Sequence, residues 1–200
     1  MSVDDHPLMR EGLVAMLRTQ SDMTVVAEAG TGPEAIEQYR KHRPDVVLMD
    51  LRLPGMSGVE ATQEIRKEFP DAKVIMLTTY DGDEDIYRAL EAGAQAYTLK
   101  ETVGEELLQL IRDVNAGNRR IPPGIAARLA QNFPRVELSE RELDVLKLMA
   151  KGMRNKEIGT ALGIAEATVK IHVQKIFSKL RVTDRTQAVV VAANRGFIHL

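Results

Sequence analysis

The sequence predicts an α/β domain with a five-stranded, doubly wound parallel sheet, followed by a smaller all-α domain of four helices. Two patterns predict this arrangement. In residues 1–116, short apolar runs alternate with segments whose apolar residues recur at helical spacing, and parallel neighbours in a sheet need such crossover helices. In residues 138–200, apolar residues recur at helical spacing only, and no strand-like run appears.

The elements of the first domain follow one another at regular intervals. A short first strand ends at Val3, and the other four strands are expected at residues 23–29, 45–49, 73–77 and 96–99. The helices between them are expected at residues 7–20, 33–42, 58–69, 83–92 and 103–116. Each of these helices is long enough to carry the chain back across the sheet, so all five strands can run parallel.

The alternation stops at Gly117. Pro122-Pro123-Gly124 is a turn signal, Pro134 is unfavourable inside a helix, and only residues 125–129 form a short amphipathic piece. We therefore predict a first domain of residues 1–116, a linker of residues 117–137 and a second domain of residues 138–200.

The second domain starts with a helix-capping signal. Ser139 is followed three residues later by Glu142, the spacing of a capping box. Further helices are expected at residues 155–162, 165–180 and 184–194, with Gly163 closing the first of them. The tight turn after Gly163 is typical of a helix-turn-helix.

Composition narrows the class of protein. The chain has 200 residues of which 44% are hydrophobic, which supports a packed core, and it has no cysteine, which excludes disulfide and thiolate chemistry. It opens without a basic segment followed by an apolar one, and no run of about 18 apolar residues occurs. We expect a soluble cytoplasmic protein with no membrane partner.

Charge is distributed unequally between the two parts. Residues 138–200 hold 11 Lys and Arg against 6 Asp and Glu, a net charge of +5, whereas residues 1–137 carry a net charge of −7. An acidic half joined to a basic half suggests that one part handles a metal or a regulatory charge and the other contacts a polyanion.

Polar side chains close four of the expected strands. They are the pair Asp4-Asp5, Asp50, Thr78 and Lys100. Because the carboxyl ends of parallel strands meet at one edge of a sheet, we expect these side chains to lie close together. Any one of them alone is better explained as a turn, cap or solvated residue, but their joint placement favours a Mg²⁺ site that accepts a phosphoryl group.

The motifs around these residues resemble the receiver domain of bacterial two-component response regulators. The motifs are Asp4-Asp5-His6-Pro7, Met49-Asp50-Leu51-Arg52-Leu53-Pro54-Gly55-Met56-Ser57-Gly58, Leu77-Thr78 and Tyr97-Thr98-Leu99-Lys100. The resemblance covers residues 1–116 and implies a flavodoxin-like sheet with Asp50 as the phospho-acceptor and a sensor histidine kinase as partner. It also implies that Mg²⁺ is held by Asp4, Asp5, Asp50 and the main-chain carbonyl of Arg52, and that Thr78, Tyr97 and Lys100 form the switch.

The first strand departs from that pattern. Receiver domains have about five apolar residues before the acidic pair, in a strand that lies inside the sheet, whereas this chain supplies Met1, Ser2 and Val3. We expect unpaired backbone groups beside this strand, from a trimmed or misassigned start or from a weakly folded edge. The affinity of the acidic pair for a metal depends on whether this short strand is stably folded.

The second domain resembles the LuxR-type helix-turn-helix of NarL/FixJ-type regulators. The motifs are Leu138-Ser139-Glu140-Arg141-Glu142, Gly152-Met153-Arg154-Asn155-Lys156-Glu157-Ile158 and Thr168-Val169-Lys170-Ile171-His172-Val173. The resemblance implies double-stranded DNA as partner, with base contacts from Thr168, Lys170, Ile171 and Gln174 and phosphate contacts from Lys156, Lys179 and Arg185. The sequence departs from relatives at Gln174, often basic or small and polar, and at Ala165, often Ser or Thr.

Helical spacing supports this interpretation. Val169, Val173, Ile176 and Leu180 should face the core, which leaves Lys170, Ile171, Gln174 and Lys175 on the opposite face. A helix with exposed lysines fits the major groove, although a solvated helix face has the same pattern. We expect His172, beside the core stripe, to be structural or close to a phosphate rather than a metal ligand.

Three functions fit these observations. The first is a transcription regulator whose DNA binding is controlled by phosphorylation of Asp50. It would form a homodimer when phosphorylated, with RNA polymerase as a further candidate partner. The second is an aspartyl-phosphate phosphatase or phosphomutase, but Arg52 stands where such an enzyme needs a second acid, so we expect no enzyme. The third is a phosphorylation-independent DNA-binding regulator with a degenerate receiver.

Overall fold

The computed structural model describes residues 1–79, 82–102, 104–118, 121, 126 and 136–199. The chain divides into two compact units, one of residues 1–81 and 86–126 and the other of residues 82–85 and 127–200. The short amphipathic piece expected at residues 125–129 lies outside the described residues, apart from residue 126, and so does Val103.

The first unit contains the predicted five-stranded parallel sheet. Its strands are β1 (Ser2–Val3), β2 (Glu28–Ala29), β3 (Val47–Asp50), β4 (Val74–Thr78) and β5 (Ala96–Leu99). They lie in the order β2-β1-β3-β4-β5, and every neighbouring pair is parallel. This confirms the predicted doubly wound fold.

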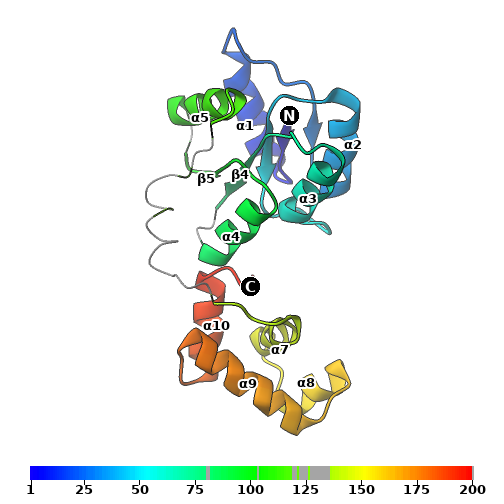
Figure 1. Cartoon of the computed structure of the whole chain (residues 1–200), viewed down its shortest axis with the longest axis vertical. Helices are drawn as coiled ribbons and strands as arrows, with labels where there is room; N and C mark the ends of the chain where they lie inside the picture. The colour runs from blue at the N-terminus through cyan, green and yellow to red at the C-terminus, as the bar shows by residue number, and fades with distance from the viewer. Residues whose placement is uncertain (80–81, 103, 119–120, 122–125, 127–135, 200) are drawn as a thin grey trace. The chain divides into compact units, whose positions relative to one another are not determined.

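Helices cover both faces of the sheet. They are α1 (Pro7–Arg18), α2 (Gly32–His42), α3 (Gly58–Glu68), α4 (Asp83–Glu91) and α5 (Glu105–Asn115). Leucines of α1 and α5 pack in one apolar cluster with residues of β3, β4 and β5, while α2 and α3 lie on the other side of the sheet (Figure 1). With helices on both faces, β3 and β4 are buried along their whole length, which explains their continuous apolar sequence.

The amino end of the sheet is incomplete. The strand expected at residues 23–29 is formed only at Glu28–Ala29, because β1 has just two residues and offers no further partner for residues 23–27. The prediction of a seven-residue strand there is wrong. A cavity of about 270 Å³ lies at this end, lined by side chains such as Leu17, Met23 and Ile111.

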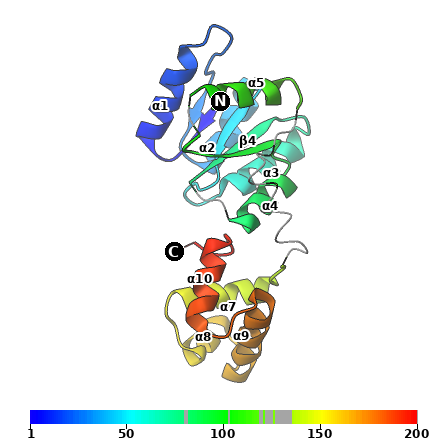
Figure 2. The ribbon, with the colours of Figure 1, turned by 90° about the vertical axis from the view of Figure 1, so that its left-hand side faces the viewer.

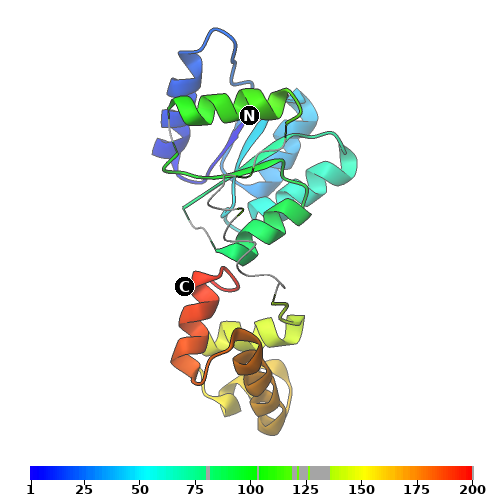
Figure 3. The ribbon, with the colours of Figure 1, turned by 60° about the vertical axis from the view of Figure 1, so that its left-hand side comes forward.

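In the described residues of the second unit, four helices surround a core of their own. They are α7 (Glu140–Ala150), α8 (Asn155–Leu162), α9 (Glu166–Leu180) and α10 (Arg185–Asn194), and they pack on one another (Figures 2 and 3). The predicted capping box joins Ser139 and Glu142, and Gly163 closes α8 in the left-handed conformation at φ 66°. Nowhere in the described residues is a helix long and apolar enough to cross a membrane.

Gly58 is expected to tolerate no side chain. It begins α3, and a Cβ built there overlaps the main-chain carbonyl oxygen of Asp50. Gly58→Ala should lower the free energy of unfolding by about 3 kcal/mol, because backbone on both sides must move. The control is Gly12→Ala, at an open position inside α1, which should raise stability by about 1 kcal/mol. Urea unfolding of both variants measures the difference, and equal stabilities would show that the loop adapts freely.

Candidate functional site

Four neighbouring strands bring the predicted polar residues to one edge of the sheet. Asp4 follows β1, Asp50 ends β3, Thr78 ends β4 and Lys100 follows β5. The main-chain N–H of Lys100 donates to the carbonyl of Thr78 at 2.6 Å, which holds the last two strand ends together. The side chains of Asp4, Asp50 and Lys100 meet there, as the alternation of strands and helices predicts.

Lys100 bridges two carboxylates. Its Nζ lies 2.7 Å from Oδ2 of Asp4 and 2.8 Å from Oδ2 of Asp50. Burial by itself lowers the pKa of Lys100, but its hydrogen bonds to Asp4 and Asp50 outweigh burial and raise the pKa above the ordinary value. The ammonium group therefore stays charged and supplies a fixed positive charge beside Asp50.

Asp50 is buried and held from two sides. Its Oδ1 accepts the main-chain N–H of Arg52 at 3.1 Å, while its Oδ2 accepts the ammonium of Lys100. Burial raises the pKa of Asp50, and these two hydrogen bonds lower it only in part. The carboxylate is thus oriented and partly desolvated, as a nucleophile requires.

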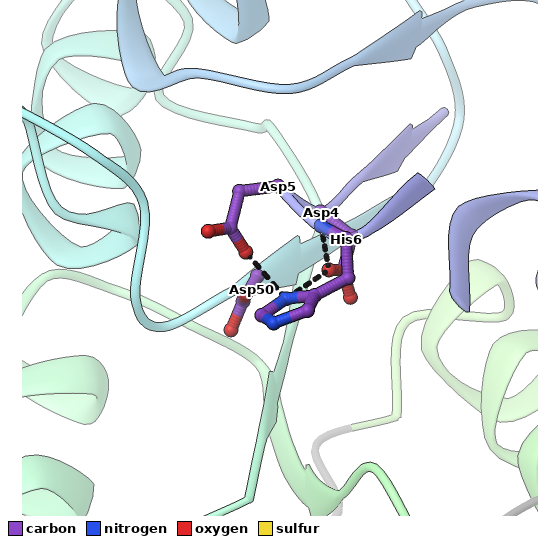
Figure 4. Close-up of side chains that lie close together, drawn as sticks. All are labelled: Asp4, Asp5, His6 and Asp50. Carbon is purple, nitrogen blue, oxygen red and sulfur yellow. Dashed lines mark hydrogen bonds and ion pairs between the residues drawn. The ribbon is translucent and has the colours of Figure 1, made fainter. Parts of the chain in front are cut away.

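Asp5 and His6 complete the cluster from the loop after β1. His6 Nδ1 lies 2.7 Å from Oδ1 of Asp5 and 3.4 Å from Oδ1 of Asp4. One ligand atom from each of Asp4, Asp5, His6 and Asp50 can be chosen so that all lie within 4.8 Å of one another (Figure 4). The sequence prediction included the three carboxylates but missed His6, although it directly follows the acidic pair.

Arg10 fixes this loop. Its guanidinium donates to the main-chain carbonyl of Asp4 at 2.6 Å and lies 3.4 Å from the carboxylate of Glu28. Since Arg10 lies on α1 and Glu28 on β2, the arginine links two elements to the backbone that carries the acidic pair. Sequence reasoning missed this contact because no local pattern relates Arg10 to Asp4.

The predicted switch residues occupy different places. Thr78 is buried at the end of β4, beside the strand that carries Asp50. Tyr97 is fully buried within β5, where it stands opposite Met76 of β4. The structure therefore brings Thr78 and Lys100 to the acidic edge and places Tyr97 in the interior of the sheet, so the switching role of Tyr97 stays a prediction. The role of the Arg52 carbonyl as a metal ligand also stays a prediction.

Helix α9 has the predicted two faces. Val169, Ile176 and Leu180 are buried in the core and Val173 is partly buried against it. Lys170, Ile171 and Gln174 are exposed on the other face, and Ile171 is 52% exposed, which is unusual for so large an apolar side chain. Thr168 is half-buried near the start of the helix, and Lys156 is exposed on α8.

Two predicted phosphate contacts already bind protein groups. Lys179 Nζ lies 2.7 Å from the carboxylate of Glu142, the buried capping residue of α7. Arg185 donates to the main-chain carbonyls of Met149 and Met153 at 3.1 and 2.6 Å. Both cations hold α7 against α9 and α10, and their predicted role at phosphates stays a prediction.

Each of the two units matches the model of a known protein family. Residues 1–112 match the family model of the response regulator receiver domain, and residues 136–192 match that of the bacterial regulatory proteins of the luxR family. The chain belongs to the two-component response regulators. Its family consists of transcription factors rather than enzymes.

Similar regulators cover nearly the whole chain. The response regulator protein VraR of Staphylococcus aureus is 43% identical in an alignment 201 residues long, which covers 98% of this chain and 96% of VraR. The crystal structure of the response regulator ChrA from a heme-sensing two-component system is 38% identical, with a TM-score of 0.58, and covers 99% of this chain and 97% of ChrA. A LuxR-family regulator from Aurantimonas sp. is 42% identical with a TM-score of 0.63, over 68% of this chain and 96% of that one.

Receiver domains generally bind Mg²⁺ at an acidic pocket, and the residues of this regulator fit that ion. Asp4 and Asp50 are buried carboxylates at the carboxyl edge of the sheet, and Asp5 is half-exposed beside them. Oxygen ligands of this type, with room for waters on the exposed side, are the donors that Mg²⁺ prefers.

The Glu142–Lys179 pair predicts a pH effect on the DNA-binding unit of the regulator. Burial raises the pKa of Glu142, but Lys179 and the main-chain N–H of Ser139 together lower it below the ordinary value of 4.5. A depressed folded-state pKa means that Glu142 stabilises the fold fully above pH 4.5 and loses this contribution as the pH falls through the folded-state value. Lys179→Met should lower the free energy of unfolding by about 1–2 kcal/mol at neutral pH.

Thermal unfolding of residues 138–200 at several pH values measures this effect. The Lys179→Met variant should differ most from wild type at neutral pH and approach it at pH 3. Lys175→Met, at an exposed position of the same helix, is the control. A constant difference between wild type and Lys179→Met at all pH values would contradict the role given to Glu142.

Proposed function

We propose that this regulator is phosphorylated on Asp50 by a sensor histidine kinase and that phosphorylation controls its binding to specific DNA sites. The observation that carries the proposal is the convergence of Asp4, Asp50 and Lys100, with the Lys100 ammonium 2.8 Å from the Asp50 carboxylate. A buried carboxylate beside a fixed cation, with further carboxylates at hand for a metal, has what phosphoryl transfer to an aspartate requires.

Asp4, Asp5, Asp50 and the main-chain carbonyl of Arg52 would hold Mg²⁺. The ion, when bound, neutralises the charge of an incoming phosphoryl group. One Asp50 oxygen attacks phosphorus, the bond from phosphorus to the kinase histidine nitrogen breaks, and the nitrogen keeps the electron pair. Lys100 then pairs with a phosphoryl oxygen, and the Thr78 hydroxyl donates a hydrogen bond to another.

The DNA-binding unit would present α9 to the major groove. We assign base contacts to Thr168, Lys170, Ile171 and Gln174, since these residues lie on or beside the face of α9 that the core leaves open. Phosphate contacts fall to Lys156, Lys179 and Arg185. Two copies of the regulator, paired after phosphorylation, would read two half-sites of double-stranded DNA and present a surface to RNA polymerase.

The incomplete first strand favours one other candidate, a DNA-binding regulator that works without phosphorylation. With β1 of only two residues and a cavity beside it, the loop that carries Asp4 and Asp5 follows a strand that pairs over a short length, and Arg10 has to hold it in place. Everything in the DNA-binding unit would serve that function equally well.

Treatment with acetyl phosphate and Mg²⁺ distinguishes the phosphorylation-controlled regulator from the phosphorylation-independent one. The full chain should gain the mass of one phosphoryl group, and gel-shift titrations should show tighter DNA binding together with a larger oligomer in size-exclusion chromatography. A chain that binds specific DNA but gains no mass with acetyl phosphate or a phosphorylated kinase would support the phosphorylation-independent regulator instead.

A further inference from the structure

His6 adds a nitrogen donor to a site otherwise made of oxygen donors. Its ring lies among the carboxylates of Asp4, Asp5 and Asp50, and one ligand atom from each of the four residues lies within 4.8 Å of the others (Figure 4). Mg²⁺ makes little use of an imidazole, since it prefers carboxylates, carbonyls and water. A function confined to Mg²⁺ therefore leaves the histidine without a part in the site.

The backbone holds His6 beside the site, while its ring can turn. The main-chain N–H of His6 donates to Oδ1 of Asp4 at 2.9 Å, and Pro7 starts α1 directly after it. The side chain is 73% exposed and makes no capping bond to the helix. To bind a metal through Nδ1 the ring must give up its contact with Asp5, and because both side chains reach solvent this contact costs little to replace.

The distances between the nitrogen of His6 and the carboxylate oxygens suit a small divalent ion. Bonds of about 2.0–2.2 Å at tetrahedral angles put the ligand atoms of zinc about 3.4 Å apart. His6 Nδ1 lies 2.7 Å from Asp5 Oδ1 and 3.4 Å from Asp4 Oδ1, so rotation of the exposed Asp5 and His6 side chains is enough to meet this geometry. Lys100 contacts Oδ2 of Asp4 and of Asp50. Each Oδ1 accepts a single main-chain N–H, from His6 and from Arg52, and a carboxylate oxygen that accepts one hydrogen bond keeps a lone pair for an ion.

We propose that His6, through Nδ1, is a ligand for Zn²⁺ in the acidic site, together with the carboxylates of Asp5 and Asp50. The site then takes either Mg²⁺ on oxygen donors or Zn²⁺ on a mixed nitrogen and oxygen set, and imidazole favours zinc over magnesium. The inference rests on the proposed function for the metal-binding role of the aspartates. Zn²⁺ bound in this way takes the place of Mg²⁺ on Asp5 and Asp50, so it inhibits the Mg²⁺-dependent phosphorylation in competition with Mg²⁺.

Metal titrations of the full chain test the assignment. Zn²⁺ affinity is measured by competition with a chromogenic chelator and Mg²⁺ affinity by calorimetry, for wild type, His6→Ala, Asp5→Ala and the control His42→Ala. His42 is an exposed histidine at the end of α2 that lines the cavity at the opposite edge of the sheet. His6→Ala should lower Zn²⁺ affinity by about tenfold or more and Mg²⁺ affinity by less than about threefold.

The remaining variants and the Mg²⁺ titration show whether a negative result rules out the role of His6 alone or the metal site as a whole. Asp5→Ala should weaken both ions, and His42→Ala should change neither. Equal Zn²⁺ affinity in wild type and His6→Ala, with Mg²⁺ binding and phosphorylation intact, overturns the role of His6 alone. Absence of binding by both ions overturns the metal site on which the proposal and the proposed function depend.

Discussion

Asp50→Asn is expected to abolish labelling of the regulator by acetyl phosphate and by a phosphorylated kinase. The amide has nearly the shape of the carboxylate, and its oxygen can still accept the N–H of Arg52. It has no anionic oxygen to attack phosphorus, so the acyl phosphate cannot form. Intact mass spectrometry measures the outcome as loss of the added phosphoryl group.

The fold of this variant should remain, since Lys100 keeps its ion pair with Asp4. Asp45→Asn is the matched control, because Asp45 is an exposed carboxylate before the amino end of the same strand and faces the opposite edge of the sheet. It should be labelled like wild type. Labelling of Asp50→Asn at wild-type level would place the phospho-acceptor elsewhere.

The spacing of apolar residues, together with the order of the segments along the chain, was enough to predict the sheet. Strands β3, β4 and β5 form where apolar runs occur, since a strand with helices on both faces must be apolar throughout. The strand expected at residues 23–29 fails because a strand needs a partner along its length, and on this side β1 reaches only Glu28 and Ala29. Whether residues 23–27 pair depends on another segment, which their own sequence does not specify.

Strand topology was also enough to predict most of the acidic site. The prediction lacked the residues that reach the site from a loop or a helix. Parallel topology brings strand ends together, so Asp4, Asp50 and Lys100 could be grouped before any distance was known. His6 and Arg10 join the site through loop geometry and a side chain that reaches back to a carbonyl. Likewise, the family resemblance implies that Lys179 contacts phosphate, but its contact with Glu142 depends on how α9 crosses α7.

DNA binding by residues 138–200 should fall steeply with salt and should depend on Lys170. This segment has its own core, which includes Val145, Leu146 and Ile176, and a net charge of +5. Lysine and arginine displace counterions from the phosphates, so the affinity falls as salt rises. In the free protein Lys170 pairs with Glu166 at 3.0 Å, an exposed pair worth about 0.3–0.5 kcal/mol, so exchanging it for a DNA contact costs little.

Lys170→Ala should separate two kinds of contact. If Lys170 reaches a base edge, specific binding weakens by about 1–3 kcal/mol and non-specific binding changes less. If it contacts phosphate alone, both weaken together and the salt slope falls by about 1. We expect the first result, because Lys170 lies beside Ile171 and Gln174 on the open face of α9. Lys147→Ala, at an exposed position of α7, serves as the control and should bind DNA like wild type. Unchanged specific binding by Lys170→Ala would show that this face of α9 does not contact the bases.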